Sequence, residues 1–287
     1  PPIDPIREDL VMSLTSYMGP RGNLLEETPD HCRLIKFMRP LFTCRELAKI
    51  KQNSDRNIKS ATFRITFPAS ETGGMEKTLL KIFEEVEAKI DSGIQYIILS
   101  DRAVDRDNAP IPSLMACAGL HHHLIRKKKR NRAAIIIETG DAREVMHFAL
   151  LLGYGADAVN PYLVFATLRD LASDGRLASG VSSDAMEDIF INAMCKGILK
   201  ILSKMGTSTL RSYRGAQIFE AIGLDDDLIG RYFTGTISRI GGLAADGIER
   251  EMLIRHRNAY ESKSRLLESS GVYRYRKGGE KHAWNPE

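Results

Sequence analysis

The sequence predicts an α/β fold in which crossover helices cover a mostly parallel sheet, and three observations support this prediction. From residue 61 onward, strand-like and helix-like patterns alternate along the chain. Residues 95–100 and 133–138 are nearly continuous apolar runs, which are typical of parallel strands buried on both faces. The stretch 74–91 has the apolar spacing of a long amphipathic helix. The alternation fits either an open doubly wound sheet or part of a β/α barrel.

The part of the chain before this core, residues 1–58, is predicted to be a helical N-terminal arm that packs on the core. Apolar residues recur at helical spacing over 6–17, and residues 19–23 contain the glycines and proline of a turn. Residues 43–51 are predicted to form a short helix whose start is fixed by a capping box that Glu46 completes.

The core is predicted to span residues 59–180. We expect its strands at 61–67, 95–100, 133–138 and 158–159, and its helices at 74–91, 113–128, 142–152 and from Pro161 onward.

A helical extension is predicted over 181–268, followed by a linker over 269–287. A glycine- and serine-rich loop at 180–184 precedes expected helices at 185–205 and 214–222, and Gly223 is a natural stop for the second of these. Residues 235–242 are interpreted as a glycine-flanked loop, and a charged helix is expected from 245 to about 267.

The composition is that of a globular protein and argues against a membrane-spanning protein and a disulfide scaffold. The 287 residues are 43% hydrophobic and 27% charged, as in an ordinary globular protein, and no apolar run approaches the roughly 20 residues that span a membrane. Four cysteines without a CxxC pair indicate neither a disulfide scaffold nor an iron–sulfur loop, so we expect a reducing, cytoplasmic location. The first residue is Pro1, which suggests a piece of a longer chain.

Basic residues gather at 126–132, but the net charge of only +4 and the lack of an aromatic RNA-binding motif argue against nucleic acid as a partner. We interpret this block as a solvated surface or as an interface with another part of a longer chain.

Polar residues follow three of the predicted strands, where parallel strands bring their carboxyl ends to one edge of the sheet. The edge is interpreted either as a polar functional site or as a set of helix caps and ion pairs, and the second interpretation is favoured because Asp141 suits an N-cap and Arg102 could neutralise Glu138. The candidate residues at this edge are Asp101, Arg102, Glu138, Arg143, Asn160 and Tyr162.

Other motifs give weak signals. His121, His122 and His123 are consecutive, so on a helix they point about 100° apart and cannot converge on one ion, although one of them, or His147, could meet a carboxylate. A role at a helix end is favoured for these histidines. The sequence has no HExxH, GxSxG or Walker motif. None of these motifs by itself indicates a catalytic, cofactor-binding or metal-binding residue.

Longer segments of the sequence resemble the central domain of the glutamate synthase large subunit, and these segments are spread over nearly the whole chain. They are PPIDPIRE (1–8), LSDR (99–102), IPSL (111–114), HHHL (121–124), ETGDAREV (138–145), HFALLLGYGA (147–156), NPYL (160–163), SKMG (203–206), SYRGAQIFEA (212–221) and YFTGT (232–236).

The resemblance implies an oxidoreductase acting on CH–NH2 donors, which makes two L-glutamate from L-glutamine and 2-oxoglutarate. It implies that this domain is itself inactive, binds no cofactor, joins a glutaminase domain to an FMN domain of the same polypeptide, and contributes to the tunnel that carries ammonia between them. FMN and an iron–sulfur cluster would lie elsewhere in that enzyme, as would the contact with a small reductase subunit or ferredoxin. Neither nucleic acid nor membrane is an expected partner.

From this resemblance we hypothesise that the edge holding the six candidate residues faces a neighbouring domain, with its charges paired to set the docking angle. The alternative is a free-standing α/β metabolic enzyme with a polar site at Asp101 and Glu138.

Overall fold

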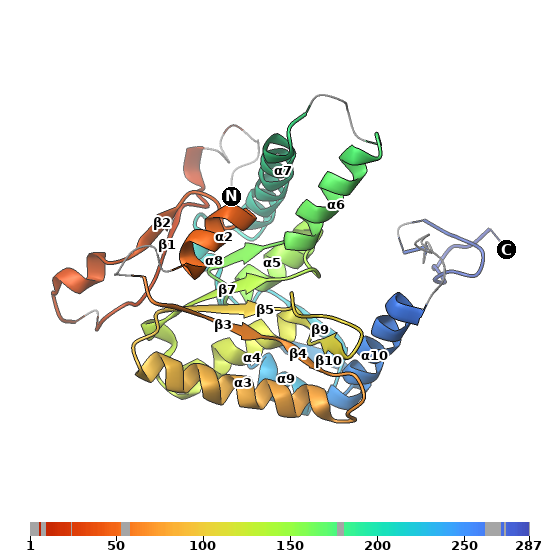
Figure 1. Ribbon diagram of the computed structural model, residues 1–287, viewed down its shortest axis with the longest axis horizontal. Helices are drawn as coiled ribbons and strands as arrows, with labels where there is room; N and C mark the ends of the chain where they lie inside the picture. The colour runs from red at the N-terminus through yellow and green to blue at the C-terminus, as the bar shows by residue number, and fades with distance from the viewer. Residues whose placement is uncertain are drawn as a thin grey trace.

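The computed structural model describes residues 6, 10–23, 25–52, 58–176, 181–261, 271–272 and 274–286. Its centre is a four-stranded sheet in the order β3 (Ser60–Arg64), β5 (Tyr96–Ser100), β7 (Ala134–Glu138) and β8 (Ala158–Asn160), as Figure 1 shows. All three strand pairings are parallel. The predicted α/β fold with a parallel sheet is confirmed.

The strands lie side by side in the order in which they occur in the sequence. The helices that connect them are α3 (Gly74–Asp91), α4 (Ser113–Arg126) and α5 (Val145–Gly153), and α6 (Tyr162–Ser173) follows β8. Because parallel crossovers are right-handed, a sheet with this order carries its connecting helices on one face. The arrangement is that of a segment of a β/α barrel, one of the two architectures that the sequence leaves open.

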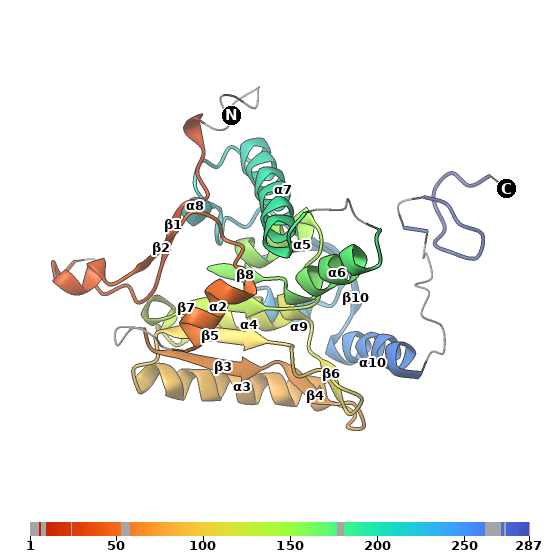
Figure 2. The same ribbon diagram turned by 45° about the horizontal axis from the view of Figure 1, so that its top comes forward.

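The N-terminal arm extends this sheet and then covers its other face. Leu41 forms a parallel bridge with Val159 of β8, and the amide of Phe42 donates to the Val159 carbonyl at 2.9 Å. Helix α2 (Cys44–Lys51) begins directly afterwards, and Thr43 and Glu46 form the predicted capping box. Figure 2 shows α2 lying in front of the sheet, with α4 behind it.

The remaining elements surround this core. Three two-stranded pairs are formed by β1 (Ser16–Met18) with β2 (Ile35–Phe37), β4 (Thr66–Pro68) with β6 (Asn108–Pro110), and β9 (Glu220–Leu224) with β10 (Ile237–Leu243). The other helices are η1 (Pro29–Cys32), η2 (Arg130–Arg132), α7 (Ser183–Lys204), α8 (Leu210–Tyr213), α9 (Asp226–Tyr232) and α10 (Ala245–Glu261).

Three predictions for local structure are wrong. The expected helix at 6–17 is helical only at residues 6 and 10–11 of its described part, and β1 begins at Ser16. The expected helix at 214–222 is instead irregular chain followed by β9, and most of the expected loop at 235–242 is β10. In each case, pairing with a distant segment overrides the local pattern.

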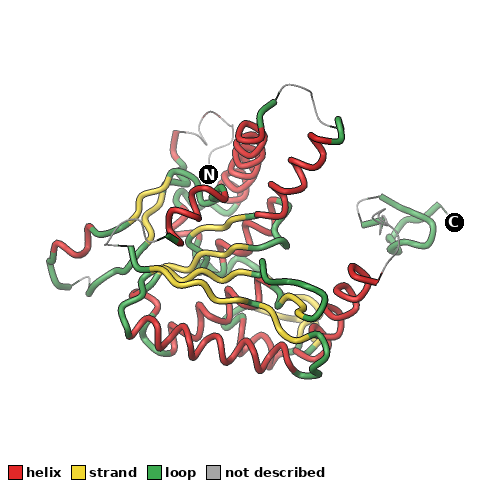
Figure 3. The backbone as a smooth tube through the Cα atoms, viewed as in Figure 1, coloured by secondary structure: helices red, strands yellow, loops and turns green. Residues whose placement is uncertain are grey.

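The ends of two predicted segments lie outside the described residues. Helix α10 is described to Glu261, so the predicted continuation to about 267 is not, and the predicted loop at 180–184 is described only from residue 181. The described residues after 270 form neither helix nor strand (Figure 3). Within the part of the chain that is described, no helix combines the length and apolar content needed to cross a membrane.

Candidate functional site

Glu138 is the centre of the polar edge that the sequence predicts. It stands in register with Ser100 and Asn160, so the three side chains end neighbouring strands on the same face of the sheet. Glu138 is only 2% exposed, yet Arg102 Nε and Lys51 Nζ donate to its two oxygens at 2.8 and 2.6 Å. The Ser100 hydroxyl adds a third hydrogen bond at 2.5 Å.

Burial alone would raise the pKa of Glu138, but hydrogen bonds from Lys51, Ser100 and Arg102 outweigh it and hold the pKa below its usual value. The carboxylate is therefore ionised at neutral pH, and both of its oxygens are occupied by protein donors. The predicted pairing of Arg102 with Glu138 is confirmed.

Arg102 links this carboxylate to two other elements. Its guanidinium carbon lies 4.2 Å from the centre of the Tyr162 ring, which is a cation–π contact, and its Nη2 lies 3.4 Å from the Cys44 sulfur on α2. Asn160, fully buried, donates to the Phe42 carbonyl at 2.8 Å and so fixes the chain just before α2.

Asp101 forms a second buried carboxylate beside the first. It is 3% exposed and accepts hydrogen bonds from the Thr139 hydroxyl at 2.5 Å, from the Gly140 amide at 3.0 Å and from Tyr162. Burial raises the pKa of Asp101 to about 6 despite these donors, and burial together with the nearby Asp101 charge raises the pKa of Tyr162.

A pKa near 6 is within the range of catalytic acids and bases. However, Asp101 and Glu138 are closed off from solvent and their oxygens are already bonded to protein donors, so neither is placed to meet a substrate. Of this cluster, the side chains of Arg102 and Lys51 remain 46% and 32% exposed, and Tyr162 is half-buried. These three side chains are accessible to another surface.

Arg143 lies apart from the other five candidates. It lines a hollow of about 320 Å³ in which the loop before α5 faces α10, together with residues such as Asp141, His147 and Arg255. The structure thus brings together Asp101, Arg102, Glu138, Asn160 and Tyr162, and its contacts do not join Arg143 to them.

Sequence reasoning missed two members of the cluster, Cys44 and Lys51. Both come from α2, whose capping box was recognisable but whose position depends on the pairing of Leu41 with β8. The presence of a lysine at the end of a predicted helix was visible, but its partner Glu138, 87 positions away, was not.

The histidines serve local structure. The His147 ring accepts from the backbone amides of Arg143 and Glu144 at the start of α5, which is the predicted helix-end role. His123 Nε2 lies 3.2 Å from the Glu87 carboxylate of α3. In the part of the chain that the structure describes, no group of three or more His, Cys, Asp or Glu side chains could hold a metal ion.

The basic block at 126–132 is neutralised largely within the chain. Lys129 pairs with both Glu87 and Asp91 of α3, at 2.8 and 2.6 Å, and Arg132 also pairs with Asp91. This pairing gives no support to a nucleic-acid surface there.

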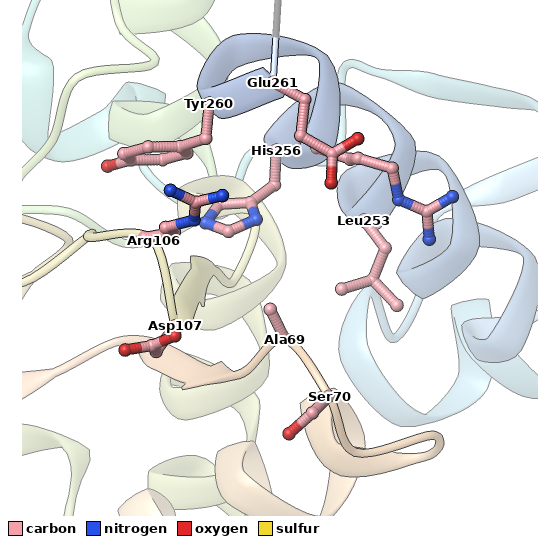
Figure 4. A pocket seen from close by; sticks show the side chains of 9 residues that line it. Ala69, Ser70, Arg106, Asp107, Leu253, His256, Tyr260 and Glu261 are labelled. Carbon is pink, nitrogen blue, oxygen red and sulfur yellow. The ribbon is translucent and has the colours of Figure 1, made fainter.

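Another hollow, of about 270 Å³, lies between α10 and the loops beside β4 and β6. Figure 4 shows Arg106, His256 and Tyr260 together on one side of it and Ser70 across from them. His256 is within 2.7 Å of the Asp105 carbonyl, so this histidine helps to hold α10 on the core. The volume falls below the roughly 300–1,000 Å³ of typical small-molecule sites.

Comparisons with known proteins identify the family. The model for the glutamate synthase central domain matches residues 1–225. The large chain of glutamate synthase [NADPH] from Bacillus subtilis is 42% identical over an alignment of 288 positions, which covers 100% of this chain and 19% of that protein. Glutamate synthase [NADH] from Schizosaccharomyces pombe is 42% identical, with 100% of this chain and 14% of the relative covered.

Ferredoxin-dependent glutamate synthase 2 from Synechocystis is 38% identical, over 100% of this chain and 19% of the relative. The chain therefore spans about a fifth or less of the length of these relatives. Among solved structures, the flavin-binding domain of baker's yeast flavocytochrome b2 covers 79% of this chain at 13% identity, with a TM-score of 0.39, which is too low to support a functional inference.

Proposed function

The chain belongs to the glutamate synthase central domain family and is one domain of a larger polypeptide, and we propose that it connects that enzyme's two reaction centres without catalysing a reaction itself. In this proposal a glutaminase domain releases ammonia from L-glutamine, and an FMN domain adds the ammonia reductively to 2-oxoglutarate, giving two L-glutamate in all. The central domain holds the two in register and forms part of the ammonia tunnel. FMN and an iron–sulfur cluster belong to the other domains, as does the contact with ferredoxin or a reductase subunit, and the enzyme is cytoplasmic.

The paired charges at the carboxyl edge of the sheet carry this proposal. Glu138 is bound by Lys51, Arg102 and Ser100, so it is fixed as a structural ion pair and is not a free acid or base. The exposed remainder of Arg102 is stacked on Tyr162 and so has a defined orientation. A surface of this kind can set the angle at which a neighbouring domain docks.

The same pairing suits a passage for ammonia. Ammonia must travel as the neutral molecule, because ammonium is not nucleophilic and is costly to desolvate. An unpaired carboxylate beside the path would hold a proton or bind ammonium. Glu138 is paired with Lys51 and Arg102, and Asp101 is buried with its oxygens bonded to protein donors, so neither carboxylate is open to bind ammonium.

The experiment uses the full-length polypeptide carrying Arg102→Ala, supplied with glutamine labelled with ¹⁵N in its amide group. We expect a larger share of the label to escape as free ammonia than in the wild type, since the docking angle is no longer fixed. Arg250→Ala is the matched control, because Arg250 is an exposed arginine paired within α10 to Asp246. Unchanged ammonia leakage in Arg102→Ala would overturn the docking role of this edge.

The alternative, a free-standing metabolic enzyme, predicts tight binding of FMN, a nucleotide or a keto acid by this chain alone. The enclosed positions of Asp101 and Glu138 do not favour it.

A further inference from the structure

A cluster of arginines lies at the opposite edge of the sheet, where β7 and β8 begin. It surrounds a hollow of about 210 Å³ lined by Gly19, Arg21, His121, Arg130, Asn131, Ala133, Asp157, Arg211 and Arg214. Ala133 immediately precedes β7 and Asp157 precedes β8, so the length of the strands, at about 3.3 Å per residue, separates this hollow from the edge that holds Glu138.

Among the described residues that line the hollow, Asp157 is the one acidic side chain, and both of its oxygens already have partners. Its two oxygens pair with Arg214 at 2.7 Å and Arg130 at 3.2 Å, and the Ile135 amide donates to it at 2.9 Å. Burial would raise the pKa of Asp157, but the charges of Arg214 and Arg130 outweigh burial and lower it. Four guanidinium groups thus face a single carboxylate.

The hydrogen bonds of the Arg130 guanidinium are made to other groups of this chain. The guanidinium donates to the carbonyls of Ala133 and Gly155 at 2.7 and 2.8 Å and to His121 Nδ1 at 2.9 Å. Burial, followed by the charge of Arg130, lowers the pKa of His121 to about 3, so this ring is neutral and adds no further positive charge.

Arg21 and Arg211 are different, because neither forms an ion pair with any described residue. Arg21 makes one long hydrogen bond to the Tyr17 carbonyl, at 3.4 Å. Burial and then the charge of Arg211 lower the pKa of Arg21, although the charge of Asp157 raises it in part. The hollow therefore carries positive charge that the described part of the chain does not balance.

Arg214 provides the second sign of a missing partner. Its side chain is 11% exposed and its Nη1 holds Asp157, while Nε and Nη2 are buried without any hydrogen-bond partner in the described structure. These two nitrogens lie on the same side of the planar guanidinium. That side can grip an oxyanion with two parallel hydrogen bonds. Buried, charged donors without acceptors are costly, and native proteins rarely leave them so.

We propose that this hollow binds a small oxyanion carrying two negative charges, of which inorganic phosphate is the simplest example, between Arg21, Arg211 and Arg214. The hollow is too small for a nucleotide when compared with sites of about 300–1,000 Å³ that hold larger ligands. Nε and Nη2 of Arg214 are closed off from solvent, so binding requires the guanidinium to turn toward the hollow for the anion to reach them. The anion then supplies the acceptors that Arg214 lacks and neutralises Arg21 and Arg211.

The direct test is a crystal of the full-length polypeptide grown without phosphate or sulfate and soaked in sodium selenate. We expect an anomalous peak between Arg21, Arg211 and Arg214, with the Arg214 side chain rotated onto it. A hollow without a peak, or one already filled by a carboxylate from another domain, would overturn the proposal.

A titration in solution provides an independent measurement. Inorganic phosphate is titrated into the full-length polypeptide at low ionic strength by calorimetry, and Arg21→Gln/Arg211→Gln is expected to weaken the binding at least tenfold. Arg257→Gln, which removes one exposed arginine from α10, is the control and is expected to change nothing. Equal phosphate binding by the double variant and the wild type would contradict the proposal. Neither experiment depends on ammonia transfer, so its failure leaves the proposed connecting function untouched.

Discussion

Lys51→Met tests the ion pair that joins α2 to the sheet. Lys51 Nζ lies 2.6 Å from a Glu138 oxygen, and Glu138 is 2% exposed. A hydrogen bond to a buried charged group contributes roughly 1.5–3 kcal/mol. Since the Lys51 side chain is 32% exposed, water screens part of this contribution, and we expect a loss of roughly 1–2 kcal/mol in the free energy of unfolding at pH 7.5. Arg102 and Ser100 still bind the carboxylate, so the fold survives.

The pH dependence follows from Glu138, whose pKa is lowered in the folded chain. A lowered carboxyl pKa contributes stability that is fully present above the unfolded value of about 4.3 and is lost as the pH falls through the folded value. The deficit of Lys51→Met should therefore be complete at pH 7.5 and shrink below about pH 4.3.

Urea unfolding, followed by circular dichroism at a series of pH values, measures this deficit. Lys81→Met is the matched control, because Lys81 is 73% exposed and its ion pair with Glu85 on the same helix is long, at 3.8 Å. Such a surface pair contributes less than about 1 kcal/mol. Equal stability of the two variants at pH 7.5, or a Lys51→Met deficit that grows as the pH falls, would refute the reasoning.

Two further predictions concern Asp101 and Gly155. Asp101 has its pKa raised to about 6, so the folded chain holds this proton more tightly than the unfolded chain, and the stability it contributes at low pH is lost as the pH rises toward 6. Relative to Asp101→Asn, the wild type should lose up to about 3 kcal/mol of unfolding free energy between pH 4 and pH 7; parallel pH profiles would contradict this. Gly155 has a φ of +118°, and a Cβ there would lie 2.4 Å from His121 Nδ1. At Gly175, φ is +70° and the space around a Cβ is open. Gly155→Ala should therefore destabilise the chain by about 2 kcal/mol more than Gly175→Ala. Thermal unfolding compares the two alanine variants, and equal melting temperatures would show that the contact with His121 is easily relieved.

The core was predictable because its signals are local. The helix expected at 74–91 is α3 (Gly74–Asp91), and the apolar runs became β5 and β7 within a residue of their expected bounds. Strands that depend on distant partners were not predictable in this way. The strand β9 pairs in parallel with β10, and its sequence, which includes Ala221, Ile222 and Gly223, has no clear alternation to mark a strand.

The candidate site was predictable in part, for a similar reason. Parallel strands must end at one edge, so the convergence of Asp101, Glu138 and Asn160 follows from topology alone. Arg143 lies beyond the end of β7, in the loop before α5. In that loop the direction of the strand no longer determines where a side chain lies. The contributions of α2 required knowing that residues 40–42 join the sheet beside β8.

We propose that this domain connects two reaction centres and performs no chemistry itself. The most direct measurement is an assay of the purified 287-residue chain, shown by circular dichroism to be folded, with glutamine, and separately with 2-oxoglutarate, ammonia, FMN and a reductant. We expect neither glutamine hydrolysis nor glutamate formation above the rate without protein. Turnover in either assay that is proportional to the concentration of the chain would contradict the claim.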